Sequence, residues 1–274
     1  MGTAAPQRYS LAHLTILDTP TPELVRIAHR TGYDYVSPRL LCHGLPGDDY
    51  SLATNPTLLA QTRAALADTG IPVHDIELAR IVEGLDPRVY EPEIAVGAEL
   101  GATGVLTSIW VPDRPFYLDA FGRLADLVAS YGMTLNLEFV PIAAVRNLAG
   151  AVDVLRETQR SNARLMIDLH HFHRSRDRVE DLDGLPPEWF EFCHLCDAPG
   201  EIPADVEKMT HILRAARSYV GEGGINPAAT LAHLPPLIYS IELPNEREEV
   251  ERGAEGHARR CLETAKAYFA QPAA

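Results

Sequence analysis

A carboxylate and three histidines stand together near the middle of the chain, in a stretch that reads ARLMIDLHHFHRS. An apolar run ends on Asp168, and His170, His171 and His173 follow it closely. A carboxylate at the end of a buried strand costs several kcal/mol unless it is protonated, paired with a cation or bound to a metal. The neighbouring imidazoles favour a divalent metal. For this stretch alone, an aspartate that caps a turn ahead of surface histidines is an equally simple interpretation.

Three other strand-like runs carry side chains of the same kind. The run TLNLEFV places Glu138 near its end, FEFCHLCDA carries His194, and LIYSIELP delivers Glu242. Because side chains alternate between the two faces of a strand, Asn136 shares the face of Glu138, and Phe192 shares the face of His194. Each has a structural alternative, such as a buried ion pair. Ligand-type side chains at matching positions on four consecutive strands nevertheless predict one metal site.

Three carboxylates and one imidazole make an oxygen-rich ligand set. Oxygen donors favour Mn²⁺ or Mg²⁺, and the histidine also allows Co²⁺ or Zn²⁺; we expect Mn²⁺. An ion with open coordination positions is suited to binding two adjacent oxygens of a hydroxy-carbonyl compound. We expect Glu138 or Glu242 to remove a proton from the carbon between those oxygens and the opposite glutamate to return it, through an enediolate.

Short apolar runs alternate with helical patterns along the whole chain. The eight runs lie near residues 9–14, 33–38, 71–78, 104–110, 134–140, 164–169, 190–196 and 237–243. This alternation predicts a parallel α/β sheet, and eight units within 274 residues predict one domain over 1–274, a single (β/α)8 TIM barrel. A doubly wound open sheet is the alternative, but the early strand-to-helix turns lack the G-x-G-x-x-G spacing of a dinucleotide site.

Capping residues and glycines mark the predicted helices. Thr21 is expected to cap a helix that closes on Gly32, and Asn55 a helix that closes on Gly70. Further helices are predicted over residues 91–100, 117–131, 143–159 and 246–270. These segments are expected to connect the strands and to cover the outside of the barrel.

Charge and composition narrow the function classes. A formal net charge of −14 opposes binding to phosphate backbones, so nucleic acid is not an expected partner. The first ten residues, MGTAAPQRYS, lack a basic region followed by an apolar one, and no run of about 18 apolar residues occurs. Neither a signal peptide nor a membrane span is therefore expected. We expect a cytoplasmic protein with a small-molecule substrate, and self-association into a homo-oligomer is compatible with this expectation.

The cysteines do not form a recognisable framework. Cys42, Cys193, Cys196 and Cys261 are too few and too scattered to predict a set of disulfides. Cys193 and Cys196 have C-x-x-C spacing, but residues three apart on a strand face opposite sides. Buried core positions are therefore expected for these two residues, rather than a redox or zinc site.

Taken together, these motifs resemble the xylose-isomerase-like TIM-barrel superfamily. That group comprises sugar phosphate isomerases and epimerases and also contains AP endonuclease family 2, the endonuclease IV group. The resemblance covers most of the chain and is strongest from Thr134 onward. It is carried by Glu138, by D-x-x-H at Asp168 and His171, and by the segments HLCDAPG, VGEGGIN and SIELPNE.

The resemblance implies a role for particular residues. It implies that His171 contacts the substrate and that Arg174 holds a substrate anion. It also implies four metal ligands: Glu138, Asp168, His194 and Glu242.

Other pocket candidates follow from the strand pattern. Strand alternation places His170, rather than His171, beside Asp168, so both histidines are retained as candidates. Trp110 and Glu77, at the ends of their strands, are further candidates for the substrate pocket. His13 belongs with them, and each of these side chains has a core role as its alternative.

The implied activity is that of a metal-dependent isomerase or epimerase acting on a keto-sugar, keto-polyol or related hydroxy-carbonyl compound. The alternative is a dehydratase or lyase of the inosose or dehydroshikimate kind, which shares the proton abstraction and then expels a β-hydroxyl. A metal-dependent nuclease is disfavoured by the negative charge, and a catalytically silent ligand-binding barrel is the non-enzymatic alternative. Because no glycine-rich phosphate cradle is found, an unphosphorylated substrate is favoured.

Overall fold

A nearly closed barrel of eight parallel strands forms the centre of the computed structural model, which describes residues 6–41 and 51–271. The order around the sheet is β2-β1-β8-β7-β6-β5-β4-β3, and isolated bridges between β2 and β3 segments bring its two edges together. The predicted single (β/α)8 TIM barrel is confirmed. The strands are β1 Tyr9–Ala12, β2 Tyr35–Ser37, β3 Asp75–Ile81, β4 Gly104–Ile109, β5 Thr134–Glu138, β6 Ala163–Asp168, β7 Phe192–Leu195 and β8 Ile238–Ile241.

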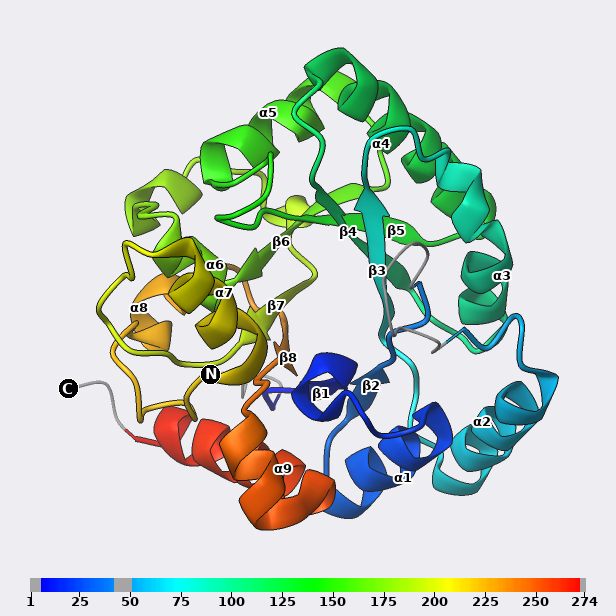
Figure 1. Cartoon of the computed structure of the whole chain (residues 1–274), viewed down its shortest axis with the longest axis vertical. Helices are drawn as coiled ribbons and strands as arrows, with labels where there is room; N and C mark the ends of the chain where they lie inside the picture. Colours follow the sequence, from blue (N-terminus) through cyan, green and yellow to red (C-terminus); the bar gives the residue numbers. More distant parts are fainter. Residues whose placement is uncertain (1–5, 42–50, 272–274) are drawn as a thin grey trace, which may run out of the picture.

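Helices surround the strands, as Figure 1 shows in a view into the barrel. Among the described residues, no helix is both long enough and apolar enough to cross a bilayer. The helices are α1 Thr21–Thr31, α2 Pro56–Thr69, α3 Glu91–Glu99, α4 Arg114–Ser130, α5 Leu148–Thr158, α6 Leu169–Arg174, α7 Val206–Ala215, α8 Pro227–Leu231 and α9 Glu246–Phe269.

The predicted ends of the first two helices are partly confirmed. Gly32 and Gly70 follow α1 and α2 with φ of 87° and 68°, a left-handed conformation that glycine adopts without strain. The Asn55 side chain caps α2 by accepting a hydrogen bond from the Leu58 N–H at 3.0 Å. The prediction that Thr21 caps α1 is wrong, because Thr21 is already helical and its hydroxyl makes no hydrogen bond within the described structure.

Other helix boundaries differ from the sequence prediction. The helix predicted from residue 143 begins at Leu148, because the Asn147 side chain accepts a hydrogen bond from the Gly150 N–H and starts the helix there. The helix predicted from residue 117 begins three residues earlier, at Arg114, after Asp113. The short helices α6, α7 and α8 were not predicted. They lie in the long segments that follow β6 and β7.

An apolar cluster fills the inside of the barrel. Leu106, Met166 and Phe192 are each at most 1% exposed, pack together with Leu78, and are joined by Ile238. Since side chains alternate along a strand, Met166 lies one inward-facing position before Asp168, and Phe192 lies one such position before His194. The cluster therefore forms an apolar floor beneath the strand ends at which the predicted ligands stand.

His13, at the end of β1, is a buried structural residue in this fold. One ring nitrogen, Nε2, donates to the Thr19 carbonyl at 2.8 Å, and Nδ1 accepts from the Arg39 N–H at 3.1 Å. This pair of contacts requires the neutral imidazole, because a protonated ring has no acceptor. Burial lowers the pKa of His13 to about 4.

We predict a loss of stability in mild acid that originates at His13. The unfolded chain protonates this imidazole near its ordinary pKa of 6.5 and the folded protein only near 4, so stability falls as the pH decreases through that window. The full effect of this shift is about 3 kcal/mol. Urea unfolding at pH 7 and pH 4.5 should show that His13→Gln, which keeps the donor to Thr19, loses less stability than the unmodified chain. Equal losses in both proteins would exclude His13 as the source.

Candidate metal centre

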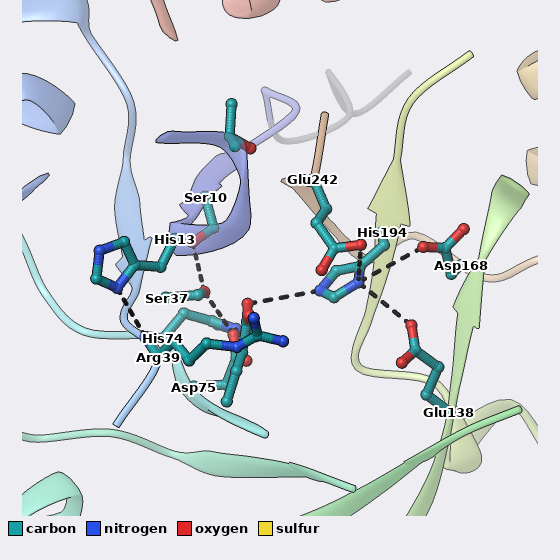
Figure 2. A network of polar contacts seen from close by, with 12 residues as sticks. Ser10, His13, Ser37, Arg39, His74, Asp75, Glu138, Asp168, His194 and Glu242 are labelled. Carbon is teal, nitrogen blue, oxygen red and sulfur yellow. Dashed lines mark hydrogen bonds and ion pairs between the residues drawn. The ribbon is translucent and has the colours of Figure 1, made fainter. Parts of the chain in front are cut away.

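Four buried side chains from four consecutive strands converge at the carboxyl end of the barrel (Figure 2). Glu138 closes β5, Asp168 closes β6, His194 lies within β7, and Glu242 directly follows β8. One ligand atom from each lies within 4.8 Å of the others, and none of the four residues is more than 5% exposed. The tertiary structure thus brings the four predicted ligands together.

The spacing of these atoms suits a single divalent ion. His194 Nδ1 lies 3.4 Å from Glu242 Oε2, 3.6 Å from Glu138 Oε1 and 3.9 Å from Asp168 Oδ2. Two atoms that each bind an ion at about 2.1 Å lie about 3 to 4 Å apart. His194 Nδ1 and Glu138 Oε1 are buried without a hydrogen-bond partner in the described structure. A cation between them would satisfy both, so these residues fit a divalent metal.

Arg217 supplies a fixed positive charge at this centre. Its side chain is 1% exposed, and Nη1 donates to Asp168 Oδ2 at 2.7 Å while Nη2 forms an ion pair with Glu242 Oε2 at 2.8 Å. The guanidinium also donates to the backbone carbonyls of Glu242 and Leu213, both at 3.0 Å. Two of the three carboxylates are therefore held in place by one buried arginine, which sequence analysis did not identify.

Long-range pairing fixes the position of Arg217. Antiparallel bridges join Ala216 to Asn245 and Ser218 to Asp197, so the segment after α7 is bound to the ends of both β7 and β8. The Asn245 side chain also donates to the Arg217 carbonyl at 2.7 Å. No local pattern in the sequence marks such a contact. The nearest feature that sequence analysis identified is the VGEGGIN segment, which begins shortly after Arg217.

The charges at this centre determine its protonation state. Burial by itself lowers the pKa of His194, but the surrounding carboxylates, chiefly Glu242, raise it well above its usual value. Burial favours a raised pKa for Glu242, but His194 and Arg217 hold it well below its usual range. Burial also favours a raised pKa for Asp168, but Arg217 together with His171 and His194 lowers it below its usual value. Because the pKa of His194 is raised, a metal that binds at Nδ1 must displace a proton.

Glu77 lies on the opposite edge of the His194 ring. Its Oε1 is 3.8 Å from His194 Nε2, and neither of its carboxylate oxygens has a hydrogen-bond partner among the residues described. Burial raises the pKa of Glu77 well above its usual value, against the influence of His194. The structure therefore places Glu77 behind a metal-site histidine, and it does not line the cavity described below.

A helix start decides which histidine faces the centre. Asp168 ends β6 and caps α6, accepting a hydrogen bond from the His171 N–H at 3.0 Å. The chain is helical beyond Asp168, so strand alternation does not extend to His170. His171 Nε2 lies 3.7 Å from Glu138 Oε1 and 3.8 Å from Asp168 Oδ2. His170 is fully buried and packs edge-on against the His171 ring.

A cavity of about 270 Å³ adjoins these residues, and its volume suits a small molecule. His171, Arg217 and both glutamates of the centre line it, together with Trp110. Arg174 does not line it. Its Nη2 donates to the Pro199 carbonyl at 2.7 Å, and its side chain borders a separate cavity.

The described cysteines occupy core positions. Cys193, Cys196 and Cys261 are buried and unpaired by disulfides, as expected, while Cys42 lies outside the described residues. Cys196 lies 3.4 Å from Arg217 Nη1 and contributes to the packing around that guanidinium.

We predict that Arg217→Met lowers the free energy of unfolding of the metal-free protein by about 3 to 5 kcal/mol, because it leaves buried carboxylates without their cation. Arg217→Lys keeps the charge and loses one of the two contacts, so its loss should be smaller. Arg146→Met at an exposed position is the matched control. Urea titration with a chelator measures all three, and a stability for Arg217→Met equal to the control would contradict this role.

Comparison with known proteins provides a family and several similar structures. Residues 25–264 match the family described as Xylose isomerase-like TIM barrel. One relative, the Inosose isomerase of Bacillus subtilis (strain 168), is 26% identical over 132 residues, which span 46% of this chain and 45% of that protein. The match thus spans about half the length of that relative.

Three solved structures illustrate the likeness of fold. The IOLI protein with a bound zinc atom superimposes with a TM-score of 0.79 at 18% identity, covering 96% of this chain and 98% of that chain. The D-allulose 3-epimerase from Methylomonas sp., in complex with D-allulose, gives 0.69 at 18% identity, covering 98% and 100%. The probable 3-DHS dehydratase AsbF from Bacillus anthracis gives 0.71 at 15% identity, covering 95% and 99%.

At these identities the structural likeness establishes the fold, and the family match establishes membership. The eight-stranded barrel is the fold that the family matched over residues 25–264 is named for. This chain belongs to the xylose isomerase-like TIM barrel family.

Proposed function

We propose that this protein is a divalent-metal-dependent isomerase or epimerase of a small hydroxy-carbonyl compound, such as a keto-sugar or keto-polyol. The observation that carries the proposal is the convergence of Glu138 and Glu242 on one buried cation site that opens into a cavity. The names of two similar proteins, Inosose isomerase and D-allulose 3-epimerase, support the reaction class.

The metal is proposed to be held by Glu138, Asp168, His194 and Glu242. When bound, the divalent ion would act as a Lewis acid toward two adjacent substrate oxygens. Three carboxylates favour Mn²⁺, and the zinc in the IOLI protein structure makes Zn²⁺ the second candidate.

The two glutamates are proposed to move the proton. Both lie beside the same ring nitrogen of His194, Nδ1, and they reach it from different strands, Glu138 from β5 and Glu242 from the end of β8 (Figure 2). One removes a proton from the carbon next to the carbonyl, and the other returns a proton to the opposite face or to the neighbouring carbon. His171 lines the cavity beside Glu138 and is placed to hydrogen-bond a substrate oxygen. Arg217 acts as a positioning residue because it holds Glu242 ionised and in place.

We predict that metal affinity increases with pH, because binding must displace the proton from His194. Below the raised pKa of His194, each decrease of one pH unit should weaken the apparent affinity for the metal by up to about tenfold. Calorimetric titration with Mn²⁺ between pH 6.5 and 8.5, in two buffers of different ionisation enthalpy, measures both the affinity and the proton released. An affinity independent of pH, with no proton released, would contradict His194 as a ligand.

We predict that Glu138→Gln and Glu242→Gln each reduce turnover by about 10²-fold to 10⁴-fold, because the amide cannot accept the proton. Keto-sugars and cyclitols are screened with the Mn²⁺-loaded protein in D₂O, and deuterium incorporation is followed by NMR. Glu222→Gln is the matched control, since Glu222 is exposed and pairs with Arg260 at the surface.

Two further readouts make this experiment decisive. Elemental analysis of each variant separates loss of metal from loss of the proton-transfer group. An ultraviolet absorbance of a conjugated enone during turnover would assign a dehydratase instead of an isomerase. Turnover by both variants close to that of the unmodified protein, with metal retained, would refute the roles assigned to the glutamates.

A further inference from the structure

Glu77 is a buried acid that the proposed proton transfer does not use. It is 1% exposed and lies on β3, whereas the four candidate ligands come from β5 to β8. A substrate in the cavity would not touch it, because Glu77 does not line the cavity. A buried carboxyl group that makes no hydrogen bond is costly, and an apolar side chain at this position would avoid that cost. Glu77 is therefore expected to serve the polar system of the metal centre.

The backbone around Glu77 is firmly held. Its N–H donates to the Pro38 carbonyl at 3.1 Å, and its carbonyl accepts hydrogen bonds from the N–H groups of Leu40 and Leu41, both at 2.8 Å. The pairing of β3 with β4 shifts in register between residues 76 and 79, so Glu77 lies in an irregular part of the strand. Irregularities of this kind redirect side chains and are common next to active sites. The direction of the Glu77 side chain is thus set by a fixed backbone.

The His194 ring presents one nitrogen to the metal centre and the other to Glu77. Nδ1 lies between 3.4 and 3.9 Å from oxygens of Glu242, Glu138 and Asp168, and Figure 2 shows these three contacts on one edge of the ring. Nε2, on the other edge, lies 3.8 Å from Glu77 Oε1 and is buried without a hydrogen-bond partner among the described residues. The ring therefore stands between the three carboxylates and Glu77.

Metal binding at one ring nitrogen fixes the state of the other. A neutral imidazole carries a single N–H, so an ion at Nδ1 requires the proton to be on Nε2. This buried donor needs an acceptor, and the carboxyl group of Glu77 is the acidic group that faces it. A carboxyl group has an accepting oxygen in both its ionised and its protonated form. A shift of less than about 1 Å in either side chain would bring the two atoms within hydrogen-bond range.

We propose that Glu77 is a positioning residue for the metal: its carboxyl oxygen accepts a hydrogen bond from His194 Nε2 and thereby commits Nδ1 to the ion. This inference rests on the proposed function, because it takes His194 as a metal ligand. An acceptor behind a metal-bound histidine fixes the orientation of the ring and makes it a stronger ligand. The alternative is that Glu77 serves only as an electrostatic partner of the Arg39 guanidinium.

Metal affinity gives the first test. Glu77→Leu removes the acceptor and should weaken the binding of Mn²⁺ by about tenfold to hundredfold in calorimetric titrations at constant pH. Glu77→Gln keeps a carbonyl oxygen and should lose clearly less affinity than Glu77→Leu. Glu191→Leu is the matched control, because it removes a carboxylate that pairs with Arg164 at the opposite end of the barrel. Urea unfolding of each variant confirms that it is folded.

A spectroscopic signature gives the second test. Protein with ¹⁵N-labelled histidine is loaded with Zn²⁺, and long-range ¹H–¹⁵N spectra identify the nitrogen that carries the proton; comparison with His194→Gln assigns the signal. The Nε2 proton of His194 should lie further downfield in the unmodified protein and in Glu77→Gln than in Glu77→Leu, because the hydrogen bond deshields it. If Glu77 only paired with Arg39, this shift would be the same in all three proteins.

Unchanged Mn²⁺ affinity in Glu77→Leu, an equal Nε2 proton shift in all three proteins, or equal loss of affinity in Glu77→Gln and Glu77→Leu would overturn the inference. The spectra of the unmodified protein separate this failure from failure of the proposed function. A His194 ring that binds the metal through Nδ1 and does not respond to Glu77 contradicts the inference alone. A protein that binds neither Mn²⁺ nor Zn²⁺, or binds them without His194, contradicts the proposed function.

Discussion

The need to compensate buried negative charge governs the functional end of this barrel. Three carboxylates, Glu138, Asp168 and Glu242, lie within a few ångströms of one another in a place that water scarcely reaches. Like charges held so closely raise each other's pKa and oppose ionisation unless cations lie between them. Arg217 provides one permanent cation, and His194 provides a second one that a metal can replace. These two cations hold the pKa of Glu242 well below its usual range, and they also contribute to the lowered pKa of Asp168.

The strands that form this centre carry apolar side chains deeper in the barrel and polar side chains at their carboxyl ends. Inward-facing positions deeper in the barrel hold Met166, Phe192 and their neighbours, which exclude water from beneath the centre. The next inward-facing positions hold the polar side chains of the candidate metal centre. Electrostatic interactions are stronger where water is excluded, so the apolar floor increases the effect of each charge above it. Glu77 extends the polar system behind His194, where it faces the ring edge opposite the metal-site carboxylates.

The cavity combines two kinds of wall. One wall consists of carboxylates arranged for a cation, and the other contributes Arg39 and Arg80. Arg217, which also lines the cavity, pairs with Asp168 and Glu242.

The sequence by itself determined the barrel, because eight alternating strand and helix patterns allow few other folds, and it identified the four candidate ligands whose side chains converge. Strand alternation depends only on local backbone geometry, so it identifies which side chains face inward without knowledge of the neighbours. It does not extend past Asp168, where the backbone becomes helical. A ring nitrogen of both His170 and His171 lies close to Asp168, and His171 is the one that also lies beside Glu138 and lines the cavity.

Only the tertiary structure revealed that Arg217 contacts the carboxylates and that Arg39 and Arg80 line the same cavity. Arg217 reaches the centre through pairings with the ends of two distant strands, and Arg39 and Arg80 meet the same cavity from β2 and β3 on the other side of the barrel. A long, flexible arginine has no periodic signature, and its partner is chosen by the three-dimensional field of surrounding charges. The sequence therefore indicated the positions of the acidic side chains, whereas the tertiary structure determined which arginine side chains lie close to them.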